Sequence, residues 1–241
     1  MIALLAAVPF ETEQLRSRLN RQSDDCWTGQ IAGDDVLLTH SGVGKANAAA
    51  AACRLILRHA PQAVILLGCG GAYPGSALRI GDLAVASVEI FGDEGSLTPD
   101  GFLDLEQLQL PIHRSDRQTL YNHVPLDPLL SKWAGSQLTE FTAPQGRNVK
   151  RGAFATVSCC SGTTAGGTEL AARTGGICEN MEGAAVALVC YKHGLPLLEL
   201  RGISNRVEDR DPRRWDLPAA TMIAQAAVLH LLQHWPEKPC R

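Results

Sequence analysis

The chain has 241 residues, 45% of them hydrophobic and 20% charged, and its formal net charge is −3 at pH 7. These proportions are ordinary for a globular protein and leave enough apolar residues for a sizeable core. The basic residues form no block that would indicate a nucleic-acid-binding surface. We therefore expect a small-molecule ligand and no nucleic-acid partner.

The first ten residues, MIALLAAVPF, are apolar, but no basic segment precedes them and they are too few to cross a membrane. They predict a buried N-terminal strand, and we expect a cytoplasmic protein without a membrane anchor. The eight cysteines include one adjacent pair, Cys159 and Cys160, but no CxxC motif and no Cys/His spacing typical of zinc sites. We therefore expect reduced thiols, no metal and no cofactor.

Short apolar runs bounded by Gly or Pro alternate with longer Ala-rich or amphipathic stretches. Strands are predicted at residues 2–8, 36–40, 63–68, 83–88, 153–158 and 195–204. Helices are predicted at residues 44–60, near 127–138, at 181–194 and at 217–235. The pattern is otherwise weak from residue 91 to 151. The alternation indicates an α/β fold with helices on both faces of a sheet, and we interpret residues 1–241 as a single domain.

Polar residues gather where the predicted strands end. Glu11 and Glu13 follow the first strand, GCGGAYPG the third, SCCSGTTAG the fifth and RGISNRVEDRD the last. The stretch CENMEGAAVALVC, residues 178–190, predicts a helix with Glu179 and Glu182 in its first turn, where either acid could serve only the helix dipole or a cap. Because ligands bind at the carboxyl ends of strands in such sheets, a binding site is expected there.

Several common catalytic motifs are missing from the sequence. GCGGAY fits the dinucleotide-binding fingerprint poorly, because PGSALRIGD follows it in place of a helix. The sequence also contains no GxxxxGK[ST], GxSxG or HExxH motif. P-loop nucleotide hydrolysis, serine-ester chemistry and zinc proteolysis therefore lose support.

The ordered set AVPFE, SGVGKANAAAA, GCGGAYPGSALRIGD, ENMEGAAVALVC and RGISNRVEDRD resembles the nucleoside phosphorylase and hydrolase superfamily. Within that superfamily the chain is similar to the 5′-methylthioadenosine/S-adenosylhomocysteine nucleosidases and, more closely, to the futalosine hydrolases. The resemblance implies a three-layer fold with a central mixed β-sheet flanked by helices. It also implies cofactor-free hydrolysis of an N-ribosidic bond, in which water attacks C1′ while the purine leaves.

The resemblance assigns roles to particular residues. Glu11 matches the general base that activates water, whereas Glu13 is expected to be a solvated acid. Glu182 matches the glutamate that accepts hydrogen bonds from the ribose hydroxyls, with Met181 packed beside the sugar. Asn205 stands at the position that contacts the leaving purine. Further substrate-binding residues are expected at Gly70, Gly71, Cys160, Ser161, Gly162, Asn180 and Trp215.

Asn205 is a departure from the adenine-releasing nucleosidases, which carry an aspartate there. A carboxamide cannot act as a general acid, but its NH₂ can donate to O6 while its oxygen accepts N7–H. This chemistry favours hypoxanthine over adenine as the leaving base, as in futalosine. Arg210, Arg213 and Arg214, together with Trp215, are candidates for the 5′ substituent or for a solvated surface turn.

Glu11 would repel phosphate, so the sequence favours hydrolysis over phosphorolysis. Two alternatives stay open. One is an adenine-releasing nucleosidase acting on aminofutalosine, methylthioadenosine or S-adenosylhomocysteine, and the other is a non-catalytic nucleoside sensor. The resemblance further implies a homodimer or a higher homo-oligomer.

Overall fold

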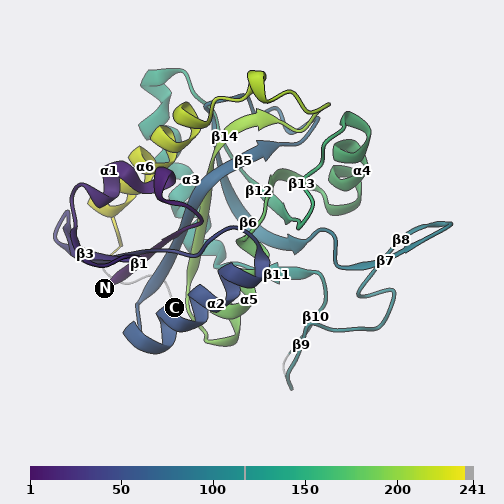
Figure 1. Ribbon diagram of the computed structural model, residues 1–241, viewed down its shortest axis with the longest axis horizontal. Helices are drawn as coiled ribbons and strands as arrows, with labels where there is room; N and C mark the ends of the chain where they lie inside the picture. The colour runs from purple at the N-terminus through teal and green to yellow at the C-terminus, as the bar shows by residue number, and fades with distance from the viewer. Residues whose placement is uncertain (117, 237–241) are drawn as a thin grey trace.

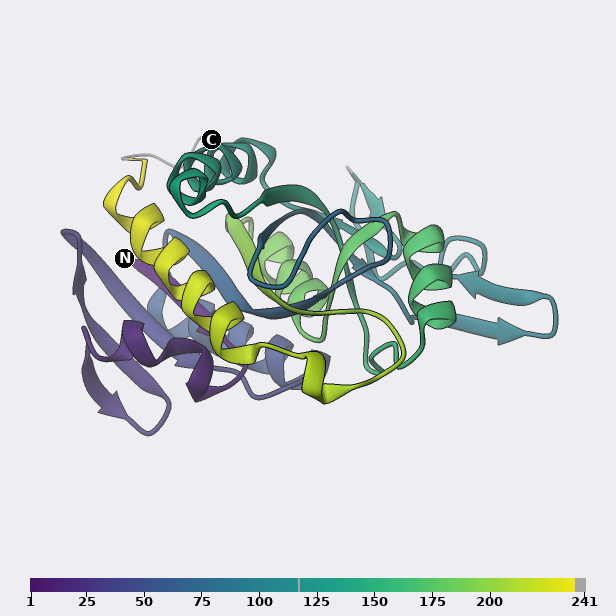
Figure 2. The same ribbon diagram turned by 90° about the horizontal axis from the view of Figure 1, so that it is seen from above.

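The computed structural model describes residues 1–116 and 118–236, and its main sheet has helices on both faces (Figures 1 and 2). The strands of this sheet are β1 Ile2–Ala6, β2 Asn20–Ser23, β3 Cys26–Ile31, β4 Asp34–His40, β5 Ala63–Ala72, β6 Leu83–Phe91, β11 His123–Pro125, β12 Val149–Thr156, β13 Gly176–Asn180 and β14 Leu197–Arg206. Two small ribbons are formed by β7 Gly95–Thr98 with β8 Gly101–Asp104 and by β9 His113–Arg114 with β10 Thr119–Leu120.

The α-helices are α1 Glu13–Arg16, α2 Lys45–His59, α3 Pro128–Thr142, α4 Thr164–Thr174, α5 Gly183–Lys192 and α6 Leu217–Gln233. Short 3-10 helices occupy Pro9–Thr12, Ala143–Gln145 and Pro212–Arg214. Helices α2 and α5 pack together on one side of the sheet, and α3 and α6 pack together on the other (Figure 1). Asp127 caps α3 and Asp216 caps α6 by accepting backbone N–H groups, which explains where these helices begin.

The strand order β11-β6-β12-β13-β5-β1-β4-β3-β2 is mixed, and β5, β1 and β4 run parallel at its centre. Strand β14 lies outside that linear order, because it pairs with β5 on one side and with β6 on the other. Five strands therefore close into a ring, in which each strand pairs with the next in the order β5, β14, β6, β12, β13 and back to β5. Half of the main sheet is thus a small closed barrel that continues into an open sheet through β1.

Each face of the sheet has its own apolar core. Leu55, Val186 and Ile203 belong to the core under α2 and α5. Leu4, Leu138 and Val228 belong to the core under α3 and α6. Strands β1, β5 and β14 are buried along most of their length because both of their faces are covered. The sequences of β1 and β5 are unbroken apolar or glycine runs, whereas β14 also buries the charged residues Glu199 and Arg201. In the part of the chain that the structure describes, no helix is both long enough and apolar enough to span a membrane.

The predicted α/β fold with a flanked mixed sheet is confirmed, but two local predictions were wrong. Residues 178–180 are not the start of a helix: they end strand β13, and α5 begins only at Gly183. GCGGAY is not a turn after a strand, because β5 continues through it to Ala72. The predicted pattern also missed the polar strand β2, helix α4 and the ribbons between residues 95 and 120.

Candidate active site

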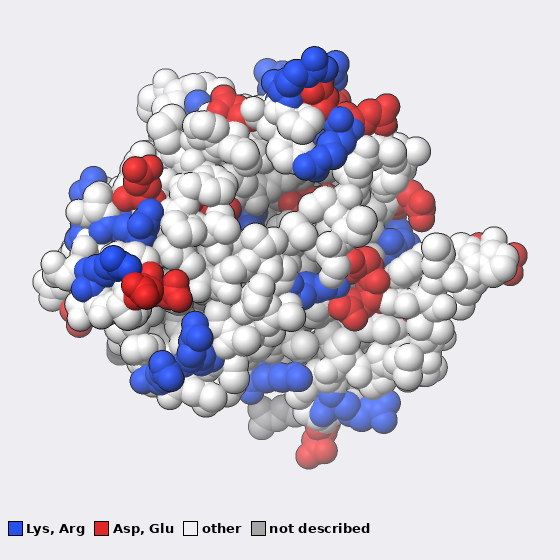
Figure 3. Space-filling view, in the orientation of Figure 1, with Lys and Arg blue, Asp and Glu red and all other residues white. Residues whose placement is uncertain are grey.

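A cleft of about 300 Å³ lies over the glycine-rich end of β5 and the segments that follow β1, β13 and β14. On the face seen in Figure 3 the surface is hollowed between the helices, and acidic and basic atoms are visible in the depression. The lining residues include Glu11, Gly70, Gly71, Cys160, Ser161, Asn180, Met181, Glu182, Asn205 and Trp215. The structure therefore brings ten of the eleven predicted site residues to one cleft, and Gly162 does not line it.

Glu11 is held by three backbone N–H groups and is only 5% exposed. Its Oε2 accepts from Ala7 N at 3.1 Å and from Val8 N at 3.2 Å, while its Oε1 accepts from Cys69 N at 2.9 Å. Burial raises the pKa of Glu11, and the nearby Arg201 guanidinium opposes that rise only partly. Glu11 is therefore a fixed carboxylate whose basicity is higher than that of an exposed glutamate. Glu13, the rival acid, is exposed at the start of α1 and does not line the cleft.

Glu182 stands immediately before α5, as its N-cap residue, and is 4% exposed. Its Oε1 accepts from Gly44 N at 3.0 Å, and its Oε2 lies 3.4 Å from Arg201 Nη1. It makes no side-chain cap hydrogen bond to its own helix. The side chain is therefore turned from the helix toward the cleft, which favours a ligand-binding function over capping.

Glu179 proves to be an anchor for a loop, not the helix cap considered above. Its two oxygens accept from Ser161 N at 3.0 Å and from Ser161 Oγ at 2.6 Å, and Tyr73 OH donates to it at 3.0 Å. Burial raises the pKa of Tyr73, and the charge of Glu179 raises it further, so the phenol stays a donor. The loop that carries Cys160 and Ser161 is thereby fixed against β13.

The glycines of β5 allow the side chains of Glu11, Arg201 and Cys178 to lie close to the strand backbone. A Cβ at Gly68 would come within 2.5 Å of Glu11 Oε1 and 2.8 Å of Arg201 Nη1, and one at Gly70 within 2.5 Å of Cys178 Sγ. None of these glycines has a positive φ, so they are required for close approach and not for a turn.

Asn205 is half-buried at the end of β14. Its Oδ1 accepts from Ser204 Oγ at 2.8 Å, and its Nδ2 donates to Arg206 O at 3.0 Å. These contacts orient the amide and leave one N–H and one lone pair on it for a ligand. Ser204 is therefore a positioning neighbour that the sequence analysis did not identify.

Three other predicted site residues, Asn180, Gly162 and Cys160, differ in the contacts that they make. Asn180 lines the cleft, but its amide is engaged below it: Oδ1 accepts from Gly183 N at 2.7 Å, and Nδ2 donates to Glu89 Oε1 at 2.9 Å. Gly162 O accepts from Arg210 N at 3.1 Å and so joins two loops at the edge of the cleft. Burial raises the pKa of Cys160 to about 11, which keeps its thiol neutral.

The turn after β14 gives its arginines different surroundings. The Arg210 guanidinium lies 4.5 Å from the centre of the Trp215 ring, and both residues line the cleft. Arg213 pairs with Asp211 at 2.8 Å and Arg214 with Glu208 at 3.1 Å on the exposed turn. Only Arg210 and Trp215 of this group are placed to meet a ligand in the cleft.

Comparison with known proteins places this chain in a family. The family model of the phosphorylase superfamily matches residues 1–233. The chain belongs to the phosphorylase superfamily. A futalosine hydrolase of Thermus thermophilus is 32% identical over 86% of this chain and 84% of that protein. A 5′-methylthioadenosine/S-adenosylhomocysteine nucleosidase of Shewanella frigidimarina is 31% identical over 86% of this chain and 84% of its own length.

The fold of this phosphorylase-superfamily chain also matches solved structures. The nucleosidase of Neisseria meningitidis, solved in complex with methylthio-immucillin-A, has a TM-score of 0.81 at 21% identity and covers 97% of this chain and 98% of its own. The nucleosidase of Colwellia psychrerythraea, solved with adenine, has a TM-score of 0.82 at 22% identity over 100% of this chain and 97% of its own. The enzyme class that the sequence predicted is confirmed: this superfamily member is an N-glycosyl hydrolase.

Arg201 is a charged residue of this superfamily member's cleft to which the sequence analysis gave no role. It is 1% exposed on β14, where its Nε donates to Glu199 Oε1 at 2.9 Å and its Nη1 lies 3.4 Å from both Glu182 Oε2 and the Cys69 carbonyl. The sequence LLELRGIS could have indicated a role for Arg201, because a glutamate and an arginine inside an otherwise apolar strand require partners when they are buried.

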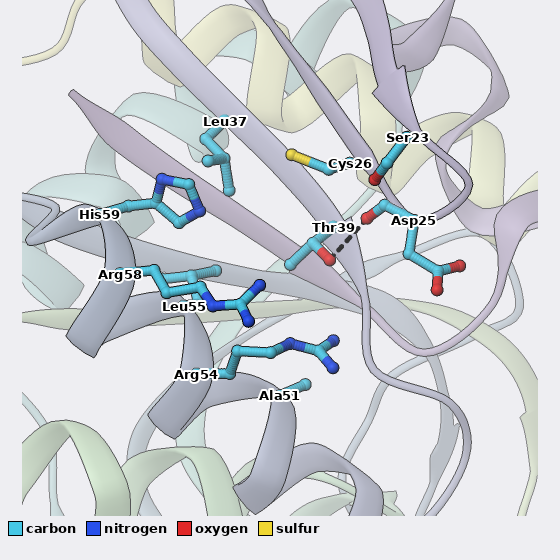
Figure 4. A pocket seen from close by; sticks show the side chains of 10 residues that line it. All are labelled: Ser23, Asp25, Cys26, Leu37, Thr39, Ala51, Arg54, Leu55, Arg58 and His59. Atoms are coloured by element: carbon cyan, nitrogen blue, oxygen red, sulfur yellow. Dashed lines mark hydrogen bonds between the residues drawn. The ribbon is translucent and has the colours of Figure 1, made fainter.

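A second cleft, of about 220 Å³, lies between α2 and strands β3 and β4 (Figure 4). Arg54, Arg58 and His59 line it from the helix, and the Asp25 carboxylate points away from them. It contains none of the strand-end carboxylates, so we assign the superfamily's chemistry to the first cleft.

In the described residues 1–116 and 118–236, no group of three or more His, Cys, Asp or Glu side chains is placed to hold a metal ion.

Proposed function

We propose that the chain hydrolyses the N-ribosidic bond of futalosine and releases hypoxanthine and dehypoxanthine futalosine, a step of menaquinone biosynthesis. The observation that carries this proposal is the convergence of Glu11, Glu182 and Asn205 on one cleft. These three residues offer a base for water, an acceptor for ribose hydroxyls and an amide for the purine. Relatives named futalosine hydrolase at 31–34% identity support the same substrate.

Glu11 acts as the general base in this proposal. A water molecule gives one proton to Glu11 while its oxygen bonds to C1′, and the C1′–N9 bond breaks with its electron pair leaving on the purine. The raised pKa of Glu11 suits this task, because proton transfer is most efficient when the pKa of the base approaches the working pH. Three backbone donors fix the carboxylate, so little reorganisation is needed.

Glu182 accepts hydrogen bonds from the 2′- and 3′-hydroxyls. Its negative charge also favours the positive charge that develops on the ribose as the purine leaves. Gly44 N donates to Oε1 and Arg201 Nη1 contacts Oε2, so each oxygen already has one partner and the orientation in which the hydroxyls can bind is restricted. Met181 packs beside the sugar.

Asn205 reads the leaving base. Its remaining N–H donates to O6 of a 6-oxopurine, and its oxygen accepts N7–H as the proton arrives from solvent. Adenine offers an amino donor where hypoxanthine offers O6. The amide therefore supports hypoxanthine, while the Ser161 loop and the glycines of β5 supply backbone contacts to the ring.

Water is the nucleophile because the cleft is too acidic for phosphate. Glu11, Glu182 and Glu199 surround the single arginine at its base, Arg201. A phosphate dianion would need free cationic donors, whereas this guanidinium already pairs with two carboxylates. At the other end of the cleft, the Trp215 ring and Arg210 suit an aromatic, negatively charged 5′ arm such as that of futalosine.

The adenine-releasing alternative rests on one observation: nucleosidases of Shewanella are about as similar to this chain as the futalosine hydrolases are. Asn205 stands against it. We further propose that the enzyme works in the cytoplasm as a homodimer. We also propose that residues 1–241 form one catalytic unit, because the cleft combines Glu11 near one end of the chain with Trp215 near the other.

Chromatography of the purified protein with futalosine, aminofutalosine and inosine tests this function. We expect free hypoxanthine from futalosine in phosphate-free buffer, and slower release from the other two nucleosides. A ribose-1-phosphate product, or release only when phosphate is present, would overturn hydrolysis. Faster release of adenine from aminofutalosine would replace the proposed substrate with the alternative.

A further inference from the structure

Two fully buried glutamates lie beneath the cleft and have no part in the reaction described above. Glu89 on β6 and Glu199 on β14 are both 0% exposed. Both carboxyls face Gly183, where a Cβ would overlap Glu89 Oε1 and come within 2.5 Å of Glu199 Oε2. Buried carboxyls are costly to keep without partners, so this pair requires an explanation.

The hydrogen bonds around the pair leave one oxygen unsatisfied unless a proton lies between the two groups. Glu199 Oε1 accepts from Arg201 Nε, but among the described residues no donor reaches Glu199 Oε2. Glu89 Oε2 contacts Thr156 Oγ1 at 2.6 Å, and Glu89 Oε1 accepts from Asn180 Nδ2 at 2.9 Å. Glu89 Oε1 lies beside Glu199 Oε2 at Gly183, and two carboxyls bond to each other only when one is protonated.

The proton belongs on Glu89. Glu199 is the member paired with the Arg201 guanidinium, which favours its charged form. Burial raises the pKa of Glu89, and the negative charge of Glu199 raises it further. The remaining titratable neighbours are Glu182, also near Arg201, and the Cys178 thiol of β13, whose pKa burial holds well above its usual range.

Each of the two buried glutamates is connected to Glu182 through one intermediate residue. On one side, Glu199 holds Arg201, and Arg201 Nη1 contacts Glu182 Oε2. On the other side, Glu89 holds Asn180 Nδ2, and Asn180 Oδ1 accepts from Glu182 N at 3.0 Å and from Gly183 N. The carboxyl of Glu182 and its backbone are therefore located by the same buried pair.

We propose that Glu89 and Glu199 form a buried acid–carboxylate pair with one shared proton, and that this pair positions Glu182 through Arg201 and Asn180. The inference rests on the proposed nucleosidase function for the role of Glu182. Glu89 and Glu199 are positioning residues, since neither lines the cleft. Glu89 serves as the neutral donor and Glu199 as the counter-charge of Arg201.

The two members should respond differently to the same substitution. Glu89→Gln keeps a neutral donor toward Glu199, although the same nitrogen cannot also accept from Asn180 Nδ2, so a modest loss is expected. Glu199→Gln removes the charge that holds Arg201 and frees the guanidinium to move against Glu11 and Glu182. We expect kcat/KM to fall less than about tenfold in Glu89→Gln and at least about a hundredfold in Glu199→Gln, with Glu13→Gln as an unchanged control.

Infrared difference spectroscopy with carboxyl-labelled glutamate gives a readout that needs no substrate. At pH 8 the wild-type protein should show a carboxylic-acid C=O band that Glu89→Gln lacks and Glu13→Gln keeps. A wild-type spectrum without the band assigned to Glu89, or equal kcat/KM losses in the two variants, would overturn the pair. Should Glu199→Gln fail to fold, the spectra of the wild type and Glu89→Gln still decide the protonation. If no nucleoside is hydrolysed, the proposed function fails while the spectra still test the pair.

Discussion

Replacing Glu11 with glutamine separates its basicity from its shape. The glutamine oxygen can take the place of Oε2 and accept from Ala7 N and Val8 N, but its NH₂ then faces the Cys69 N–H across the 2.9 Å now occupied by a hydrogen bond. One buried donor loses its acceptor, which costs about 1–3 kcal/mol of stability. In a chain of this length that loss lowers Tm by about 2–4 °C per kcal/mol.

The catalytic loss should be larger than the structural one. Without a base for the attacking water, kcat should fall by about 10² or more while KM changes little, because glutamine fills the same space. Single-turnover release of base, measured by chromatography in phosphate-free buffer well below the Tm of the variant, isolates the chemical step. Glu13→Gln is the matched control, since Glu13 is exposed and outside the cleft. If Glu11→Gln kept its rate within about threefold of wild type, Glu11 would not be the base and the hydrolytic mechanism would lose its main support.

Three further outcomes are expected. Asn205→Asp should lower kcat/KM for the hypoxanthine nucleoside and raise it for the amino analogue, a combined swing of about 2–4 kcal/mol; a ratio that stays within about threefold means that Asn205 does not read the base. Trp215→Ala should raise KM for futalosine more than for inosine, and equal effects on both would remove the ring from the 5′ site. His40 is buried with a pKa lowered from 6.5 to about 4 by burial, so its neutral form stabilises the fold fully above pH 6.5, and that contribution is lost as pH falls toward 4. Chemical denaturation across that range should show a shallower pH dependence in His40→Asn than in wild type, whereas an unchanged slope would mean that His40 titrates normally.

The sequence predicted those helices and strands whose positions are set by their own residues and not by distant parts of the chain. The boundaries of α2 and α6 follow from periodicity and from prolines that stop or start a helix, and β1 follows from an unbroken apolar run. Residues 178–180 were mistaken for the start of a helix because Glu and Asn suit a helix start, whereas β12 and β5 on either side hold this segment extended. Strand β2 was missed because all of its side chains are exposed and give no apolar alternation.

The sequence likewise predicted one part of the site and missed another. Glu11, Glu182 and Asn205 were predicted because the motifs that contain them resemble those of a known superfamily. The network below them was not, because Glu89 and Glu199 are 110 positions apart and meet only through the pairing of β14 with β6. Each is a single acid in a largely apolar segment, to which the sequence analysis gave no role, and only the tertiary structure supplies the reason to keep them buried.

The closing strand of the barrel also has a consequence for the order in which the site can form. Residues 197–206 follow the other four barrel strands in the sequence, and they fill the gap between β5 and β6 and carry both Arg201 and Asn205. A nascent chain that has not yet exposed them has Glu11 and Glu182 without the guanidinium between them, and two apolar strand edges open to wrong partners. Insertion of one strand therefore closes those two edges and brings the charges of the site together in the same event, so chains in which β14 has not inserted should be catalytically silent.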